Sequence, residues 1–156
     1  MLSYQTTERL KLSFCASAVL ILAFTLVSKL ILASGSYPIL DKTEPLTETL
    51  TNRQLIVIAA FVELGAVLGL VVASSTIRKL LIVAWIASAF LAYRSTLLIL
   101  GIKSTCYCLG FVTIVLSRQL SDTLSRILLG YLLFGSLICL LDSRRQPTIG
   151  VTSKFP

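Results

Sequence analysis

Apolar residues occur along this chain in long continuous blocks, separated by short polar stretches. The first three blocks cover residues 12–33, 54–75 and 80–101. Each block reaches the roughly 20 residues that a helix needs to cross the hydrocarbon core of a bilayer. The pattern therefore predicts three membrane-spanning helices in the first two thirds of the chain.

The last third of the chain is less regular. Residues 104–141 are too many for one span, and charged residues interrupt them. We predict that 106–120 forms a surface or partly re-entrant segment. A fourth span is then expected at 122–141, and it would open at Ser121-Asp122, because serine and aspartate favour the N-cap of a helix.

These elements predict an all-α fold, an integral membrane four-helix bundle that forms a single domain at residues 12–141. Residues 1–11 would be a short N-terminal segment and residues 142–156 a tail. A cleaved signal peptide is the alternative for the first block. That block is longer than a typical signal-peptide core and three others follow it, so an uncleaved helix is favoured.

Composition agrees with a membrane location. The chain has 156 residues, 56% hydrophobic and 13% charged, with a mean hydropathy of +0.91. A soluble domain has about half apolar and about a quarter charged residues, so membrane lipid is the expected partner of the excess apolar surface. The net charge of +7 is spread over block ends, and no nucleic-acid partner is expected. Histidine, the commonest metal ligand, is absent, and no metal site is expected.

Lysine and arginine are unevenly distributed between the two sides that four spans would create. With the N-terminus inside, the inner side carries Arg9, Lys11, Arg78, Lys79, Arg144, Arg145 and Lys154, and the outer side carries Lys42, Arg53, Lys103 and Arg118. Basic residues favour the cytoplasmic side. The sequence thus predicts a multi-pass protein of the inner membrane with both termini cytoplasmic, and the loop 34–53 and the segment from Cys106 would face the periplasm or the exterior.

Two charged residues lie deep in predicted spans. A helical rise of 1.5 Å per residue puts Glu63 roughly 13 Å and Arg94 roughly 10 Å below the outer ends of their helices. An ionisable group at such depth costs several kcal/mol unless it is paired or hydrated. Similar depth on consecutive antiparallel helices predicts that Glu63 and Arg94 touch. The pair would either be a buried ion pair that only fixes helix packing, or form a binding or proton-relay site.

The four cysteines divide by predicted depth. Cys15 and Cys139 lie near the inner ends of their spans, where small buried residues are expected. Cys106 and Cys108 lie beyond the outer end of the third span. Two thiols one residue apart on an oxidising face favour redox chemistry, and a disulfide across so short a loop would be strained and easily reduced. A pair of unlinked thiols is the alternative.

Several of these residues, taken in order, resemble a known family. The matching positions are Glu63-Leu64-Gly65 with Leu68, then Arg78, then Cys106-Tyr107-Cys108-Leu109-Gly110, and finally Ser125-Arg126. This arrangement is similar to the MauE branch of the DoxX-like membrane proteins, over about residues 10–141. That branch usually shows C-G-C-F-G at the cysteines, whereas Tyr107 and Leu109 depart from it here.

The resemblance implies a four-helix inner-membrane protein concerned with sulfur redox at the outer face. MauE proteins belong to methylamine-utilisation systems and are associated with maturation of a disulfide-rich periplasmic enzyme subunit, and DoxX-like relatives are linked to thiosulfate:quinone oxidoreduction. Cys106 and Cys108 would be the catalytic residues, and Glu63, Arg94 and Arg126 binding or relay residues. A periplasmic client or thioredoxin-like protein would be the partner, and quinone is the candidate cofactor.

A non-catalytic membrane subunit or assembly scaffold is the second hypothesis for this chain. In that case the charged residues and glycines within the spans would only build the bundle. A transporter fits less well, because four spans without a detectable repeat fall short of the usual transporter plan.

Overall fold

A computed structural model describes residues 2–44, 49–101 and 109–145 of the chain. Its elements are α1 (Leu2–Ser34), η1 (Pro38–Asp41), α2 (Asn52–Val72), α3 (Thr76–Ile99), α4 (Val112–Val115) and α5 (Arg118–Arg145). Within the described residues, an isolated bridge between Thr43 and Thr51 is the sole β-type pairing. The predicted all-α fold with four long helices is therefore confirmed.

Four of the helices are long and apolar enough to cross a membrane. These stretches are Glu8–Ser34, Asn52–Val72, Thr76–Ile99 and Gln119–Ser143. The predicted spans overlap all four. The prediction for the last helix was wrong at its start, because α5 already begins at Arg118 and the Ser121 amide donates to the Ser117 carbonyl at 3.0 Å. Ser121 is thus an interior residue of α5 and does not cap it.

Short polar residues set the starts of the two middle helices. Thr51 accepts a hydrogen bond from the Gln54 amide, and the Gln54 side chain accepts one in return from the Thr51 amide, so that α2 opens with a capping box. Ser75 accepts from the Arg78 amide at the start of α3. These caps satisfy amide groups that have no partner inside the helix.

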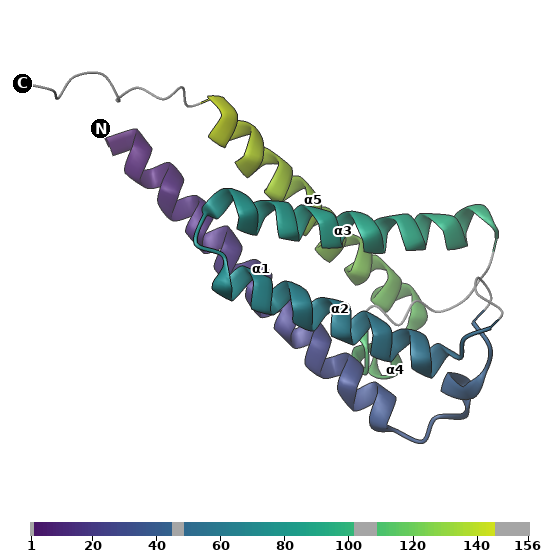
Figure 1. Cartoon of the computed structure of the whole chain (residues 1–156). Coiled ribbons are helices and arrows are strands. Elements are labelled where there is room, and N and C mark those ends of the chain that lie inside the picture. The colour runs from purple at the N-terminus through teal and green to yellow at the C-terminus, as the bar shows by residue number, and fades with distance from the viewer. Residues whose placement is uncertain (1, 45–48, 102–108, 146–156) are drawn as a thin grey trace, which may run out of the picture.

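The four long helices run antiparallel in chain order (Figure 1). The start of α1, the α2–α3 turn and the end of α5 lie together, and we call this the terminal end. The opposite end, which we call the loop end, carries the two longer connections, α1 to α2 and α3 to α5. At the terminal end, Lys11 of α1 lies 3.1 Å from Asp142 of α5.

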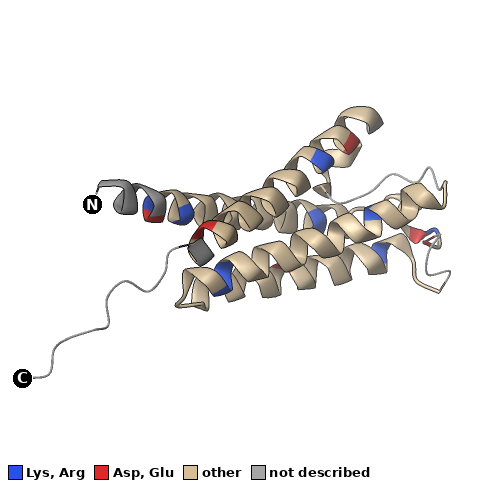
Figure 2. Cartoon of the chain, turned by 90° about the horizontal axis from the view of Figure 1, so that it is seen from above, with Lys and Arg blue, Asp and Glu red and all other residues tan. Residues whose placement is uncertain are grey.

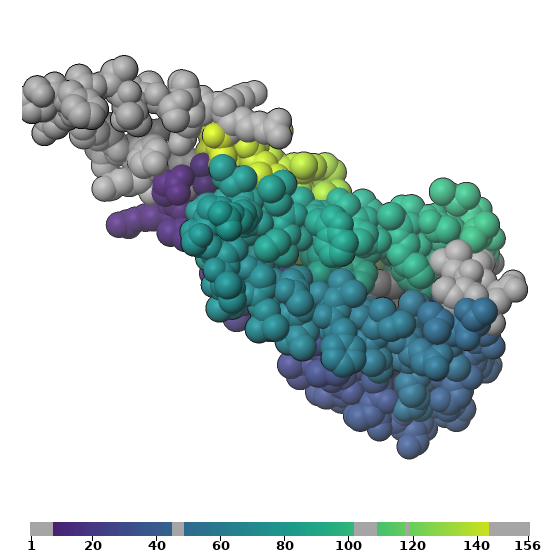
Figure 3. Space-filling model, viewed as in Figure 1, coloured from purple at the N-terminus to yellow at the C-terminus, as the bar shows by residue number. Residues whose placement is uncertain are grey.

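The bundle consists of two closely packed helix pairs. α1 makes its most extensive contacts with α2, and α3 makes its most extensive contacts with α5. The α2–α3 contact, visible across the face shown in Figure 3, joins the two pairs. This pairing determines which side chains can meet inside the bundle.

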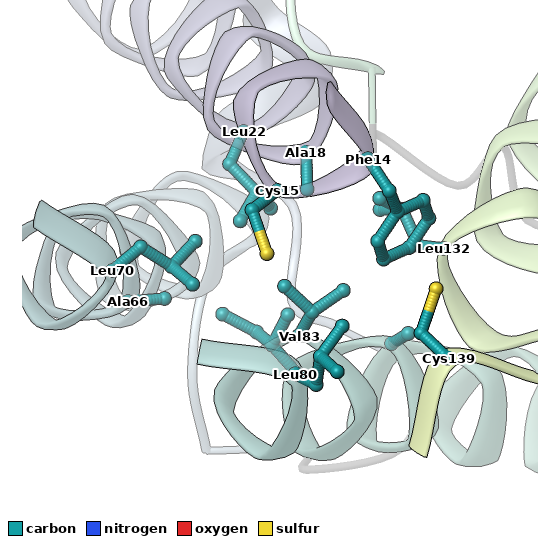
Figure 4. Packing of buried hydrophobic residues seen from close by; sticks show 12 residues of the cluster. Phe14, Cys15, Ala18, Leu22, Ala66, Leu70, Leu80, Val83, Leu132 and Cys139 are labelled. Carbon is teal, nitrogen blue, oxygen red and sulfur yellow. The ribbon is translucent and has the colours of Figure 1, made fainter. Parts of the chain in front are cut away.

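An apolar cluster fills the half of the bundle nearer the terminal end (Figure 4). Its buried members are Phe14, Cys15, Ala18, Leu22, Ala66, Leu70, Leu80, Val83, Ile86, Ala87, Leu132 and Cys139. They come from all four long helices. Gly135 of α5 allows a close approach here, because a Cβ at that position would lie 2.2 Å from the ring of Phe14.

The connection between α1 and α2 folds back over the loop end. Leu40 of η1 is buried against Leu32 of α1 and Ile56 of α2. Arg53 donates to the carbonyl oxygens of Ala33 at 2.6 Å and Gly35 at 3.2 Å, and so ties the start of α2 to the end of α1. The loop end therefore has its own small apolar contact, separate from the main cluster.

The outer surface of the four helices is largely apolar. Large side chains such as Leu20, Phe61, Val72, Trp85 and Phe134 are more than half exposed. Lys, Arg, Asp and Glu are sparse along these helices (Figure 2). Such a surface suits lipid, because lipid covers apolar side chains that water would not.

Candidate functional site

Buried polar contacts gather between the middle of the bundle and its loop end. Three of them join side chains that are far apart in the sequence: Lys29 with Glu63, Arg94 with Asp122, and Tyr93 with Glu44. Ionisable groups buried within membrane-spanning helices are candidate functional residues.

Lys29 and Glu63 form an ion pair inside the first helix pair. Lys29 of α1 donates from Nζ to Oε1 of Glu63 on α2, and both residues are 2% exposed. The Lys29 ammonium also lies 5.2 Å from the centre of the Phe90 ring on α3, within the range of a cation–π contact. Glu63 Oε2 is buried and makes no hydrogen bond with any described residue.

Arg94 and Asp122 form the matching ion pair inside the second helix pair. Nη2 of Arg94 on α3 lies 2.8 Å from Oδ1 of Asp122 on α5. The Arg94 side chain is 7% exposed and that of Asp122 is 30% exposed. Nε and Nη1 of Arg94 are buried and find no hydrogen-bond partner among the described residues, and the same holds for the hydroxyl of Ser121 beside Asp122.

The predicted contact between Glu63 and Arg94 is therefore wrong. Both residues are buried, as their depth implies, but each is paired with a different residue. The physical reason is the packing of the bundle, in which α2 faces mainly α1 and α3 faces mainly α5. Depth fixes the position of a residue along a helix but leaves its direction around the helix open.

A third contact closes the loop end. The Tyr93 hydroxyl donates to Oε1 of Glu44 at 2.7 Å. Glu44 is 1% exposed, although it belongs to the connection between α1 and α2. Its amide donates to the Leu50 carbonyl at 2.8 Å. The connection thus brings a carboxylate into contact with α3, one residue before Arg94.

Arg126 lies apart from this cluster. It is exposed on α5, whereas Ser125 beside it is 2% exposed and faces the interior. The structure therefore groups Glu63 and Arg94 with buried polar residues and leaves Arg126 on the outer surface. A long basic side chain there can reach the membrane interface, as arginines near span ends commonly do.

Cys106 and Cys108 lie outside the described residues, within 102–108. The residues that follow them belong to the described chain. Leu109 and Gly110 are buried, and the amide of Phe111 donates to the carbonyl of Ser28 on α1 at 2.9 Å. Residues 109–111 of the predicted re-entrant segment therefore pack against α1, whereas Ile114 and Val115 further along it are exposed.

Gly110 makes this contact feasible. Its φ of 61° belongs to the left-handed region, which favours glycine. A Cβ at this position would lie 2.4 Å from the backbone nitrogen of Lys29. The chain thus turns at Gly110, directly after the cysteines, and this turn brings the end of the cysteine motif to the backbone of the residue that pairs with Glu63.

A small cavity adjoins this contact. It has a volume of about 30 Å³, and its polar lining residues are Thr25, Lys29, Glu63 and Ser125. Leu109, the residue bonded to Cys108, also lines it. The other lining side chains are apolar and come from α1, α3 and α5.

Two spaces lined by described residues offer little to a quinone head group. The cavity beside Glu63 is an order of magnitude below the roughly 300 Å³ of small-molecule pockets. A groove of about 510 Å³ between α2 and α3 is large enough, but its lining is Val62, Gly65, Ala66, Leu81, Ile82 and Trp85, which offers little to bind quinone oxygens. Within the described residues, no cluster of three or more His, Cys, Asp or Glu side chains could hold a metal ion.

Cys15 and Cys139 belong to the other half of the bundle. They are free thiols, 6% and 7% exposed, and both point into the apolar cluster (Figure 4). The prediction that they are small buried residues is confirmed.

Comparison with known proteins adds nothing to this geometry, since no protein-family model, curated protein or solved structure matches the chain.

Sequence reasoning missed Lys29 and Asp122 as partners of the two deep charges. Lys29 is the single charge in the first apolar block, and the energetic argument applied to Glu63 applies equally to it. Its position near the end of the block concealed this role, because basic residues near span ends commonly extend to the membrane interface. Asp122 was predicted to be a cap, and the true start of α5 places it within the helix, where it can face Arg94.

Proposed function

We propose that this chain is a multi-pass membrane thiol–disulfide exchange factor of the MauE/DoxX type. Cys106 and Cys108 would exchange disulfides with a client protein or a thioredoxin-like partner. The membrane would be the inner membrane, with the termini cytoplasmic and the cysteine pair at the periplasmic face, as the distribution of Lys and Arg favours.

The observation that carries this proposal is the anchoring of the cysteine motif. Gly110 can pack against the backbone of α1 because it lacks a side chain, and Leu109 lines the cavity beside the Lys29–Glu63 pair. A connection that only joined two helices would need no such contact. Leu109 and Gly110, the described end of the motif, thus lie next to a buried ion pair.

The exchange chemistry needs only sulfur groups. A client thiolate attacks one sulfur of a Cys106–Cys108 disulfide, the S–S bond breaks, and a mixed disulfide forms while the other cysteine leaves as a thiolate. A second client thiolate then displaces the first cysteine. The client gains a disulfide, and the two cysteines end as thiols that hold the two electrons and take up protons.

The pair must then be oxidised again. A thioredoxin-like partner in its disulfide form can do this by the same two exchanges, with the cysteine pair now acting as the attacking dithiol. The partner leaves as a dithiol, so that electrons and atoms balance without a cofactor. This route suits the small size of the cavity beside Glu63, which leaves no room for a quinone ring.

Trapping of the mixed disulfide tests the proposal. The Cys108→Ala variant in membranes is mixed with a thioredoxin-like protein in its disulfide form, and a maleimide is added to cap the released thiol. Cys106 should then stay joined to the partner in a complex that disappears on reduction. The matched control is Cys139→Ala, which removes a thiol buried in the apolar cluster and should give no such complex.

Failure to trap with both Cys106→Ala and Cys108→Ala would contradict the proposal. So would full client maturation by the double variant Cys106→Ser/Cys108→Ser in cells.

A non-catalytic membrane scaffold is the second candidate, and one observation favours it. Each closely packed helix pair contains one buried ion pair, Lys29–Glu63 in the first and Arg94–Asp122 in the second. Polar pairs of this kind can fix helix register without taking part in chemistry. Under this alternative the cysteine variants would behave like the unaltered chain, and the ion-pair variants would lose assembly.

A further inference from the structure

We infer that the cavity beside Lys29 and Glu63 binds water, and that protons reach Glu63 from the loop end along the buried polar face of α5. The site would work in this way whether or not Cys106 and Cys108 exchange disulfides.

The cavity offers a water molecule the partners it needs. Glu63 Oε2 is a buried acceptor that finds no donor among the described residues. In this arrangement the hydroxyls of Thr25 and Ser125 each donate to a backbone carbonyl of their own helix, at 3.0 Å and 2.8 Å. Water can donate to Glu63 and to one of these hydroxyl oxygens, and accept from the Lys29 ammonium.

The space is sufficient for this water. A cavity of about 30 Å³ exceeds the about 10–15 Å³ that a single water molecule requires, and a site with two to four polar partners is the kind that holds one. A dry cavity would leave the Glu63 carboxylate oxygen desolvated, which costs free energy in a medium of low dielectric constant.

Polar atoms continue from the cavity toward the loop end. Ser121 lies one turn before Ser125 on α5, about 6 Å nearer that end by the rise of an α-helix. Its hydroxyl is fully buried and has no partner in the described chain, and the same is true of Nε and Nη1 of Arg94. Asp122, with its side chain 30% exposed, leads from this level to the outside.

The opposite direction is closed by apolar packing. Leu22 and Leu132 line the cavity and also belong to the apolar cluster of the terminal half. The same cluster also includes Leu70, Leu80 and Val83, none of which is more than 2% exposed. The described residues therefore provide a polar route on the loop side and an apolar barrier on the terminal side.

The charges around Glu63 are compatible with proton exchange. Lys29 faces it from α1, and it is the sole other charged side chain among the cavity-lining residues. From α3 the cavity is lined by Ile86, Ala87 and Phe90, and from α5 Ser125 is the polar contributor. A proton delivered through water would turn the ion pair into a contact between Lys29 and a carboxylic acid, and its departure would restore the pair.

Hydroxyl-radical labelling of bound water tests the inference. The full chain in lipid nanodiscs is exposed to short X-ray pulses, and the oxidised side chains are measured by mass spectrometry. Phe90 lines the cavity and is partly buried at the edge of the apolar cluster, whereas Phe14 is a buried member of that cluster. Because the two residues have the same intrinsic reactivity, Phe90 should be oxidised several-fold faster than Phe14.

Dilution into water that carries a heavy oxygen isotope then tests the route. The double variant Arg94→Met/Asp122→Leu replaces the ion pair by apolar groups, and it should slow the appearance of heavy oxygen in Phe90 several-fold. Ser125→Leu should fill the cavity and reduce labelling of Phe90 to the level of Phe14, with Ser125→Ala as a variant that preserves packing. Thr123→Leu, on the exposed face of α5, is the matched control and should change nothing.

Equal oxidation of Phe90 and Phe14 in the unaltered chain would overturn the water site, even if every variant failed to fold. Rapid labelling of Phe90 with an unchanged isotope rate in the double variant would overturn the route through Arg94 and Asp122.

Discussion

The two halves of the bundle differ in composition although the same four helices run through both. The terminal half is packed with apolar side chains and contains two free thiols, Cys15 and Cys139. The loop half contains the Lys29–Glu63, Arg94–Asp122 and Tyr93–Glu44 contacts. Lipid tails are as apolar as leucine, so the hydrophobic effect gives these helices little reason to associate, and close packing and polar contacts must hold them together.

This contrast separates what holds the bundle together from what it is able to do. The terminal half depends on close packing, and its two thiols lie in the apolar cluster. The loop half carries charged groups whose burial is expensive, and it is the half to which the Cys106–Cys108 motif is attached. Substitutions in the loop half should therefore destabilise the fold by leaving a particular polar partner unpaired. Substitutions in the terminal half should destabilise it by changing the packed side-chain volume.

The largest effect should come from breaking the Lys29–Glu63 pair. Glu63→Gln leaves Lys29 charged and buried without its counter-ion, and the loss should be about 3–5 kcal/mol of unfolding free energy. The double variant Lys29→Met/Glu63→Leu should lose much less unfolding free energy than the sum of the losses in Lys29→Met and Glu63→Leu. Reversible unfolding of the detergent-solubilised chain measures the single and double variants.

The same unfolding experiment has a control in Glu63 and Arg94, the two residues that the sequence predicted to be in contact. Glu63→Gln and Arg94→Gln remove members of different ion pairs, so their effects should add within a few tenths of a kcal/mol. Strong coupling between Glu63 and Arg94, together with additivity of Lys29 and Glu63, would reverse the assignment of partners.

The sequence predicted the existence of the four spans and the burial of Glu63 and Arg94, because hydropathy and depth depend on position along the chain. It did not predict the partners of these residues. Pairing depends on rotation about the helix axis and on which helices pack together, and neither is visible in a block of twenty apolar residues. The start of α5 was misplaced for a related reason, since Ser121 and Asp122 are good caps but here lie inside a helix.

A smaller effect is expected from Gly110, which joins the cysteine motif to α1. Gly110→Ala would force a residue with a Cβ into left-handed backbone, at about 1–2 kcal/mol. The Cβ would also lie 2.4 Å from the backbone nitrogen of Lys29, and the shift of α1 that this demands should raise the total loss above that of one hydrogen bond. Gly101→Ala is the matched control, because its φ is 66° but no atom lies within 4 Å of its Cβ position. Equal loss of unfolding free energy in the two variants would show that the contact with α1 contributes nothing.

The smallest of these effects concerns the hydrogen bond that closes the loop end. Tyr93→Phe removes the hydroxyl that donates to Glu44, and hydrogen bonds to charged groups contribute about 1.5–3 kcal/mol. Tyr131→Phe removes an exposed hydroxyl contact with Ser17 at 2.8 Å, and it should lose less. If thermal unfolding shows the opposite order, the greater importance of polar contacts in the loop half is not supported.

The difference between the two pairs of cysteines tests the proposed function most directly. Membranes are treated with one maleimide before reduction and a second, heavier one after reduction and denaturation, and the intact chain is weighed. Exchange at the loop end predicts that Cys106 and Cys108 carry the second label, because they react only after their disulfide is reduced. Cys15 and Cys139 should become reactive on denaturation alone, with or without the reductant. A Cys106–Cys108 pair that carries the first label throughout, in membranes kept under oxidising conditions, would contradict the account.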